Sequence, residues 1–80
     1  MRLIVVKLTE RNTQAVKFQE ILTRHGCDII MRLGLHEADS KECANEGLII
    51  LQVNEDKKSV DSLAKDIQAI GRVTVKTLEM

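Results

Sequence analysis

Aromatic residues are almost absent from this chain of 80 residues, which has no Trp, no Tyr and a single Phe, Phe18. A folded core must therefore be built from aliphatic side chains. RNA-recognition modules stack bases on aromatic side chains of a sheet, and the apolar segments of this chain contain no such residues. The composition argues against that class of RNA binding.

The chain also lacks an excess of either charge, since twelve Lys and Arg balance twelve Asp and Glu. Without a basic excess we expect no direct nucleic-acid binding. No apolar run approaches the roughly 20 residues of a membrane span, and the apolar stretch after Met1 is too short for a signal peptide. We therefore expect a cytoplasmic protein without membrane contact. Cys27 and Cys43 are then free thiols, because a reducing compartment disfavours disulfides.

Proline is absent, and no linker or low-complexity segment divides the sequence. An apolar content of 44% fits a folded globule and argues against disorder. The length is that of one small domain. We expect residues 1–80 to form a single domain.

The hydrophobic period of the sequence changes from that of a strand to that of a helix and back, twice. Strands are predicted at Arg2–Thr9, Cys27–His36, Leu48–Val53 and Arg72–Leu78. Helices are predicted at Asn12–His25, capped by Asn12 or Thr13 and ended by Gly26, and at Asp56–Ile70, ended by Gly71. This order is typical of a ferredoxin-like βαββαβ sandwich of the α+β class, with a four-stranded antiparallel sheet and two helices on one face.

Such a sheet has one face without helices, and the sequence makes that open face apolar. Alternation assigns Ile29, Met31 and Leu33 to the helix side and Ile30, Arg32 and Gly34 to the open side. The open side would further hold Leu48, Ile50 and Leu78, and either Leu3 and Val5 or Ile4 and Val6. A patch of that size exceeds what monomers usually expose. We expect a homo-oligomer, a dimer or tetramer, that associates through the sheet; an apolar ligand platform is the alternative.

Arg32, Gly34 and His36 are the candidate ligand-binding residues. A guanidinium within an apolar row needs a carboxylate or phosphate partner. A glycine in the middle of a strand often marks a place where a ligand or another backbone approaches closely. The two readings are an anionic small effector and an inter-subunit salt bridge beside a packing glycine.

His36 and Cys43 form a second candidate, a metal or redox site, to which a neighbouring subunit could contribute Cys27. Further potential ligands in the same connection are Glu37, Asp39 and Glu42. The His-x6-Cys spacing matches no established motif, so a solvated acidic loop is the simpler interpretation. His25, at the end of a helix, is expected to interact with the last carbonyl groups of that helix.

A catalytic constellation is missing from the sequence. The cysteines have no identifiable base beside them, and the turn at Thr9–Asn12 has neither a Cys-x-x-Cys nor glycines that could cradle a phosphate. We expect a protein that is not an enzyme, and the sequence identifies no cofactor.

Three segments carry a family resemblance: Asp28–Gly34, Gly47–Val53 and Ile70–Leu78. With them the sequence resembles the bacterial family of iron-only hydrogenase system regulators over nearly its whole length. That family is similar to stand-alone ACT-like domains and to the C-terminal, ligand-sensing half of nickel-responsive repressors. The resemblance implies a ferredoxin-like subunit in dimers or tetramers, with effector sites at subunit interfaces.

This sequence departs from the nickel-responsive repressors in two respects. Their nickel site uses several histidines and a cysteine, whereas this chain has only His25 and His36, so the nickel site does not carry over. No helix-turn-helix pattern accompanies the domain, so a role in transcription would act through a partner. The sequence thus predicts a regulatory ACT-like module that binds a small effector at an oligomer interface. The alternatives are a metal-binding or redox-sensing protein that uses His36 and Cys43, and a structural interaction subunit without a ligand.

Overall fold

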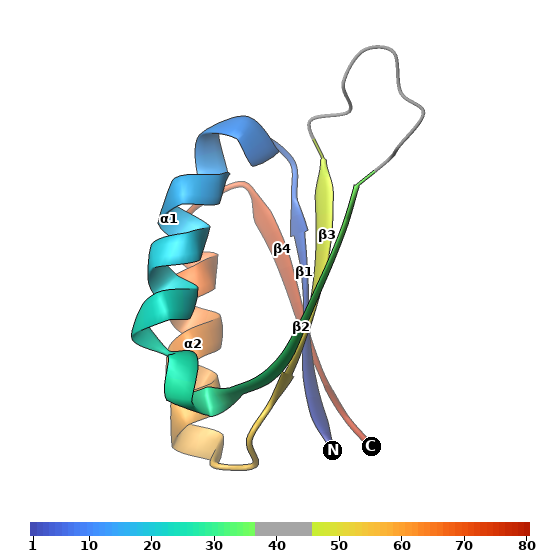
Figure 1. Ribbon diagram of the computed structural model, residues 1–80, viewed down its shortest axis with the longest axis vertical. Helices are drawn as coiled ribbons and strands as arrows, with labels where there is room; N and C mark the ends of the chain where they lie inside the picture. The colour runs from blue at the N-terminus through green and yellow to red at the C-terminus, as the bar shows by residue number, and fades with distance from the viewer. Residues whose placement is uncertain (37–45) are drawn as a thin grey trace.

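The computed structural model describes residues 1–36 and 46–80. Its elements are, in order, β1 (Arg2–Leu8), α1 (Arg11–Arg24), the short 3-10 helix η1 (Gly26–Asp28), β2 (Ile29–His36), β3 (Gly47–Val53), α2 (Lys57–Gln68) and β4 (Val73–Glu79). The strands pair antiparallel in the order β2-β3-β1-β4. Both helices cover one face of the sheet (Figure 1). The fold is therefore the predicted α+β ferredoxin-like arrangement.

The core lies between the helices and the sheet and is aliphatic except for Phe18. Its strand residues alternate along β1 and β3, and its helix residues recur at helical spacing, as the two periods require. The strands contribute Ile4, Val6, Leu8, Ile49, Leu51, Val53 and Val73, and the helices contribute Phe18, Ile21, Leu22, Val60, Leu63 and Ile67. Neither helix in the described ranges is long and apolar enough to cross a bilayer.

The helix ends differ from the prediction at α1, and α2 ends at Gln68, two residues before the predicted Ile70, with Ala69 as its C-cap. No side-chain cap hydrogen bond forms at the start of α1; Thr13 instead donates its hydroxyl to the Glu10 carbonyl oxygen. Gly26 does not end α1 in a left-handed conformation but begins η1. Gly71, after α2, does have a positive φ of 89°, which is the backbone conformation that favours glycine.

A one-residue slip in β2 overturns the predicted assignment of its faces. Ile29 pairs with Val53, but the next partner of β3, Gln52, pairs with Met31, so Ile30 is an extra residue of the kind found in a β-bulge. Beyond the slip, Arg32 pairs with Leu51, a core residue. Because side chains of paired residues share a face, Arg32 points to the helix side.

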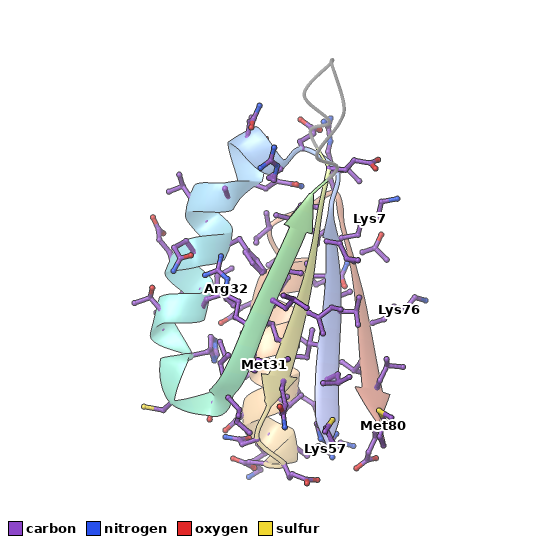
Figure 2. All side chains as sticks on the ribbon, turned by 45° about the vertical axis from the view of Figure 1, so that its right-hand side comes forward. Lys7, Met31, Arg32, Lys57, Lys76 and Met80 are labelled. Atoms are coloured by element: carbon purple, nitrogen blue, oxygen red, sulfur yellow. The ribbon has the colours of Figure 1, made fainter. Side chains whose placement is uncertain are left out.

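The open face is apolar, as predicted, although its members differ. Leu3 and Val5 belong to it, which settles the alternative in β1, and Met31 and Leu33 replace the predicted Arg32 and Gly34. Leu48, Ile50 and Leu78 complete this set, which we call the open apolar face. Met31, Leu33 and Leu78 are each about half exposed, at 45%, 47% and 49%. Lys7 and Lys76 lie at its border and point away from the helices (Figure 2).

Candidate functional site

A groove of about 1030 Å³ lies on the helix side of the molecule, between α1 and the edge strand β2. We call it the α1–β2 groove. Ala15 and Val16 line it from the helix, and Leu8 and Ile49 line it from the sheet. Its size is at the upper end of the range for small-molecule sites, which are mostly apolar with a few polar groups.

Arg32 lies within this groove and points from β2 towards α1 (Figure 2). Its Nη1 donates a hydrogen bond of 2.6 Å to Gln19 Oε1, and its guanidinium carbon lies 5.9 Å from the centre of the Phe18 ring. A guanidinium over an aromatic face is held by cation–π attraction. Both partners are neutral, so neither balances the positive charge.

Two glycines form the floor of the groove on neighbouring strands. Nothing lies within 4 Å of where a Cβ of Gly34 would stand. At Gly47 a Cβ would stand 3.0 Å from Arg11 Cδ, so the absent side chain allows the stem of Arg11 to cross the strand there. The groove is therefore open at Gly34 and closed by an arginine stem at Gly47.

The structure brings two of the three predicted site residues together, on the face opposite to the predicted one. Arg32 and Gly34 line the same groove, and the backbone of His36 pairs with Gly47. The prediction placed Arg32 and Gly34 on the open face and was wrong there, because alternation cannot anticipate the extra residue Ile30.

The predicted metal or redox site falls mostly outside the described residues, since Glu37, Asp39, Glu42 and Cys43 all belong to 37–45. Cys27 is an exposed free cysteine in η1. Within 1–36 and 46–80, no group of three His, Cys, Asp or Glu side chains is arranged to hold a metal ion.

His25 contacts acidic side chains that the sequence did not suggest. Its Nε2 donates to Asp66 Oδ2 of α2 at 2.8 Å, and its Nδ1 lies 3.9 Å from Asp28 Oδ2. The hydrogen bond with His25 is the main cause that lowers the pKa of Asp66, against a smaller desolvation effect. Electrostatic interactions with His25, Arg24 and Lys65 lower this pKa further. Only the backbone N–H of His25 makes the expected contact with α1, at the Ile21 carbonyl oxygen.

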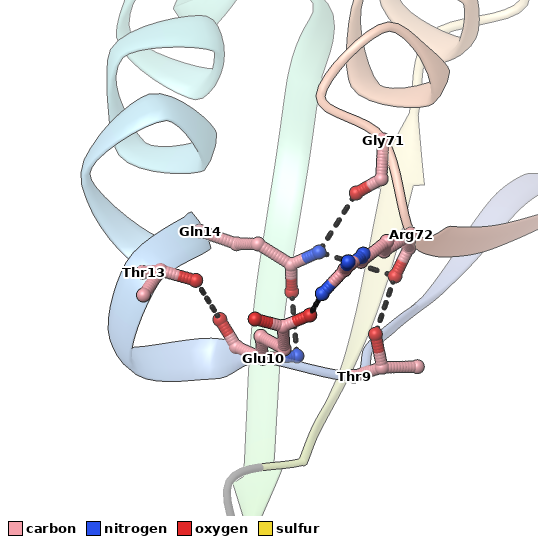
Figure 3. Close-up of polar contacts among 6 residues, drawn as sticks. All are labelled: Thr9, Glu10, Thr13, Gln14, Gly71 and Arg72. Atoms are coloured by element: carbon pink, nitrogen blue, oxygen red, sulfur yellow. Dashed lines mark hydrogen bonds and ion pairs between the residues drawn. The ribbon is translucent and has the colours of Figure 1, made fainter.

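A second polar cluster joins the β1–α1 turn to the α2–β4 turn (Figure 3). Buried Gln14 donates to the carbonyl oxygens of Gly71 and Arg72, at 2.8 and 3.1 Å, and accepts from the Glu10 N–H. Thr9 also donates to the Arg72 carbonyl oxygen, and Arg72 forms an ion pair with Glu10. These polar groups satisfy one another, so this turn is a structural junction rather than a ligand site.

The comparisons with known proteins establish the fold and nothing finer. No family model matches the sequence, and no curated protein matches it. The structure is similar to the uncharacterized protein TM1266 from Thermotoga maritima, with a TM-score of 0.81 and 23% identity, over 96% of this chain and 91% of that one.

Two enzymes contain the same fold as a part of a longer chain. Prephenate dehydratase from Streptococcus mutans matches with a TM-score of 0.61 and 19% identity, over 96% of this chain and 41% of the enzyme. Formyltetrahydrofolate deformylase from Pseudomonas putida matches with a TM-score of 0.59 and 10% identity, over 99% of this chain and 28% of the enzyme. Folds of this kind serve many functions, so these structural similarities assign no function to this chain.

Proposed function

We propose that this protein is a cytoplasmic regulatory module of the ACT-like kind, which binds a small effector and responds through its association with other subunits. The observation that carries the proposal is the groove geometry: Arg32 and Gly34 come from one strand and supply a charge and an open floor to the same apolar groove. The resemblance to the iron-only hydrogenase system regulators supports this reading. Regulation of that system would act through a partner protein.

The open apolar face supports self-association as the second part of the proposal. Met31, Leu33, Leu48 and Leu78 are all more than a third exposed, and large exposed apolar patches mark interaction sites. We propose a homo-oligomer, a dimer or tetramer, that covers this face. We propose no catalytic step for this protein.

β2 supplies a physical route between the two surfaces. Arg32 and Gly34 line the groove, while Met31 and Leu33, in the same strand, belong to the open apolar face. An effector that moved β2 would change the surface offered to another subunit. The effector must bind one subunit arrangement better than the other, because only differential affinity shifts an equilibrium.

The test is native mass spectrometry of protein purified without oxygen and without chelator. We expect an oligomer that carries the mass of a small organic molecule. In Gly34→Val the new side chain fills the groove floor, so the bound mass should be lost while the circular dichroism spectrum is unchanged. Leu33→Asp should yield a folded monomer, whereas the matched change Thr74→Asp, at an exposed polar position on the same face of the sheet, should leave the oligomer intact.

Either variant can contradict its part of the proposal. If Gly34→Val retains the bound mass, the effector does not occupy the groove. If Leu33→Asp remains oligomeric, subunits do not associate through the open apolar face. A stable wild-type monomer would remove the oligomer from the proposal altogether. A metal mass in place of an organic one would favour the metal-binding alternative.

A further inference from the structure

We infer that the α1–β2 groove selects small monocarboxylates with an apolar body. This inference rests on the proposed function and names the ligand class of that site. It is carried by two observations about the described lining of the groove: its charged groups are mainly cationic, and the remaining lining is mainly apolar.

The charges of the groove favour an anion. Arg24 and Arg32 line it, and Glu20 is the one acid among its described lining residues. The printed partners of Arg32, Gln19 and Phe18, are both neutral. A cation in an apolar surrounding gains most from a ligand of opposite charge. The acid disfavours ligands that carry several negative charges, such as nucleoside polyphosphates, because like charges repel at short range. A ligand with a single negative charge fits this balance between the cationic and acidic lining residues.

The geometry of Arg32 favours a carboxylate. Gln19 engages its Nη1, and the Phe18 ring lies beneath the guanidinium, so the planar group has a defined orientation. A guanidinium has five N–H donors in a fixed fork, and a carboxylate accepts two parallel hydrogen bonds from such a fork. Gln19 takes one donor and leaves others for a ligand.

The lining beside Arg32 favours an apolar body. Val16 of α1 is 66% exposed and lines the groove from the helix, as Ala15 does, while Gly34 and Ile49 line it from the sheet. An apolar group seated there would cover Val16 and gain the free energy of burying apolar surface. The inferred ligand places its carboxylate at Arg32 and its body between Val16 and the floor.

The experiment compares 2-naphthoate with its neutral analogue 2-naphthamide on the full chain. The protein has no Trp or Tyr, so the fluorescence of the naphthalene ring reports binding without a protein background. We expect 2-naphthoate to bind at least about tenfold more tightly than the amide, the ratio typical of a charge-assisted hydrogen-bonded contact. The methyl NMR signals of Val16 and Ile49 should shift on binding.

Substitutions assign the preference to Arg32. In Arg32→Gln we expect the two affinities to become equal, and in Arg32→Lys the ratio should fall, because an ammonium lacks the planar fork. The control Arg72→Gln makes the same change outside the groove and should keep the wild-type ratio. Inorganic phosphate at the same concentration should not displace 2-naphthoate.

Several outcomes would overturn the inference. Equal affinities of the wild type for the acid and the amide, or displacement of 2-naphthoate by phosphate, would contradict the inferred preference for a carboxylate. Failure of both probes to bind would contradict the ligand class. Val16 shifts that follow protein concentration in the absence of a probe would show that a second copy occupies the groove.

The proposed function stands or fails separately from this ligand class. If the amide binds as tightly as the acid and Gly34→Val abolishes the binding of both probes, the groove is a binding site. Only the inferred preference for a carboxylate is then wrong. If Gly34→Val leaves the binding of both probes unchanged, the groove itself is not the site, and the proposed function fails with the inference.

Discussion

His25 Nε2 lies 2.8 Å from Asp66 Oδ2, so the residue that follows α1 is bound to the side of α2. The two residues are 41 positions apart in sequence, and the contact links the end of α1 to α2. This hydrogen bond is stronger with the ionised carboxylate than with the neutral carboxyl group, which is why the pKa of Asp66 is lowered.

The stability of the protein should therefore depend on pH through Asp66. A carboxyl group whose pKa is lower in the folded than in the unfolded state stabilises the fold above its unfolded pKa, about 3.9 for Asp, and loses this effect as the pH falls through the folded pKa. We expect Asp66→Asn to be less stable than the wild type at pH 6 and equally stable near pH 2. Urea unfolding followed by circular dichroism measures both differences.

The control for this prediction is Asp61→Asn, at an exposed position of the same helix. It should leave the urea midpoint close to that of the wild type at either pH. A loss of stability in Asp66→Asn that is the same at pH 6 and pH 2 would mean that the ionised carboxylate does not stabilise the fold.

Gln14 should be the most important polar side chain of the fold. Gln14→Met keeps a similar shape but removes the hydrogen bonds to the Gly71 and Arg72 carbonyl oxygens and to the Glu10 N–H. Leaving such buried groups without partners costs about 1–3 kcal/mol, so we expect a loss of about 2 kcal/mol in urea unfolding. The same change at exposed Gln68, whose hydrogen bond to Val73 spans 3.4 Å, should cost far less; equal losses would refute the role of Gln14.

Gly71 and Gly26 form a matched pair for backbone conformation. Gly71 has a φ of 89°, and neither glycine has an atom within 4 Å of where a Cβ would stand. Gly71→Ala should lower the free energy of unfolding by about 1–2 kcal/mol, because an L side chain strains the left-handed backbone. Gly26→Ala should change it by less than about 0.5 kcal/mol. Thermal melting compares them directly, and a neutral Gly71→Ala would contradict the strain argument.

Gly34 and Gly47 form a second pair. Replacing each by alanine distinguishes the effect of backbone entropy on stability from the effect of steric crowding. Gly34→Ala has open space and should stabilise the protein by about 0.5 kcal/mol, because alanine restricts the unfolded chain. Gly47→Ala places its Cβ 3.0 Å from Arg11 Cδ, so the arginine stem must move and the gain should be cancelled or reversed. Similar changes in the free energy of unfolding of the two variants would show that the Arg11 side chain moves aside without destabilising the fold.

Hydrophobic period predicted the order and type of every described strand and of α1 and α2, because those signals are local. The core positions of α2 follow directly from their spacing. The contacts that link α1 to α2 and form the junction are not local: His25 with Asp66, and Gln14 with Gly71, join residues brought together only by the fold. No spacing rule connects such pairs.

The prediction for β2 failed for a different reason, which is visible only in the pairing. Its apolar residues alternate without interruption from Cys27 to Leu35, and the alternation itself is real. What the sequence does not show is the extra residue Ile30, which leaves Ile29 packed against the core and turns Met31 and Leu33 to the opposite face. Arg32 and Gly34, two residues of the predicted site, line the groove on the side of the sheet opposite to the predicted one.

The slip at Ile30 also affects how this chain is compared with other proteins. An alignment that places β2 residue by residue against a strand without the slip puts Arg32 in a column of outward-facing residues. Every position after Ile30 is then matched to a residue with the opposite environment, and measures of similarity over this strand are lowered without any difference in fold. For this strand, correspondence between proteins has to be assigned from the pairing with β3, because a gap of one residue decides which side chains are equivalent.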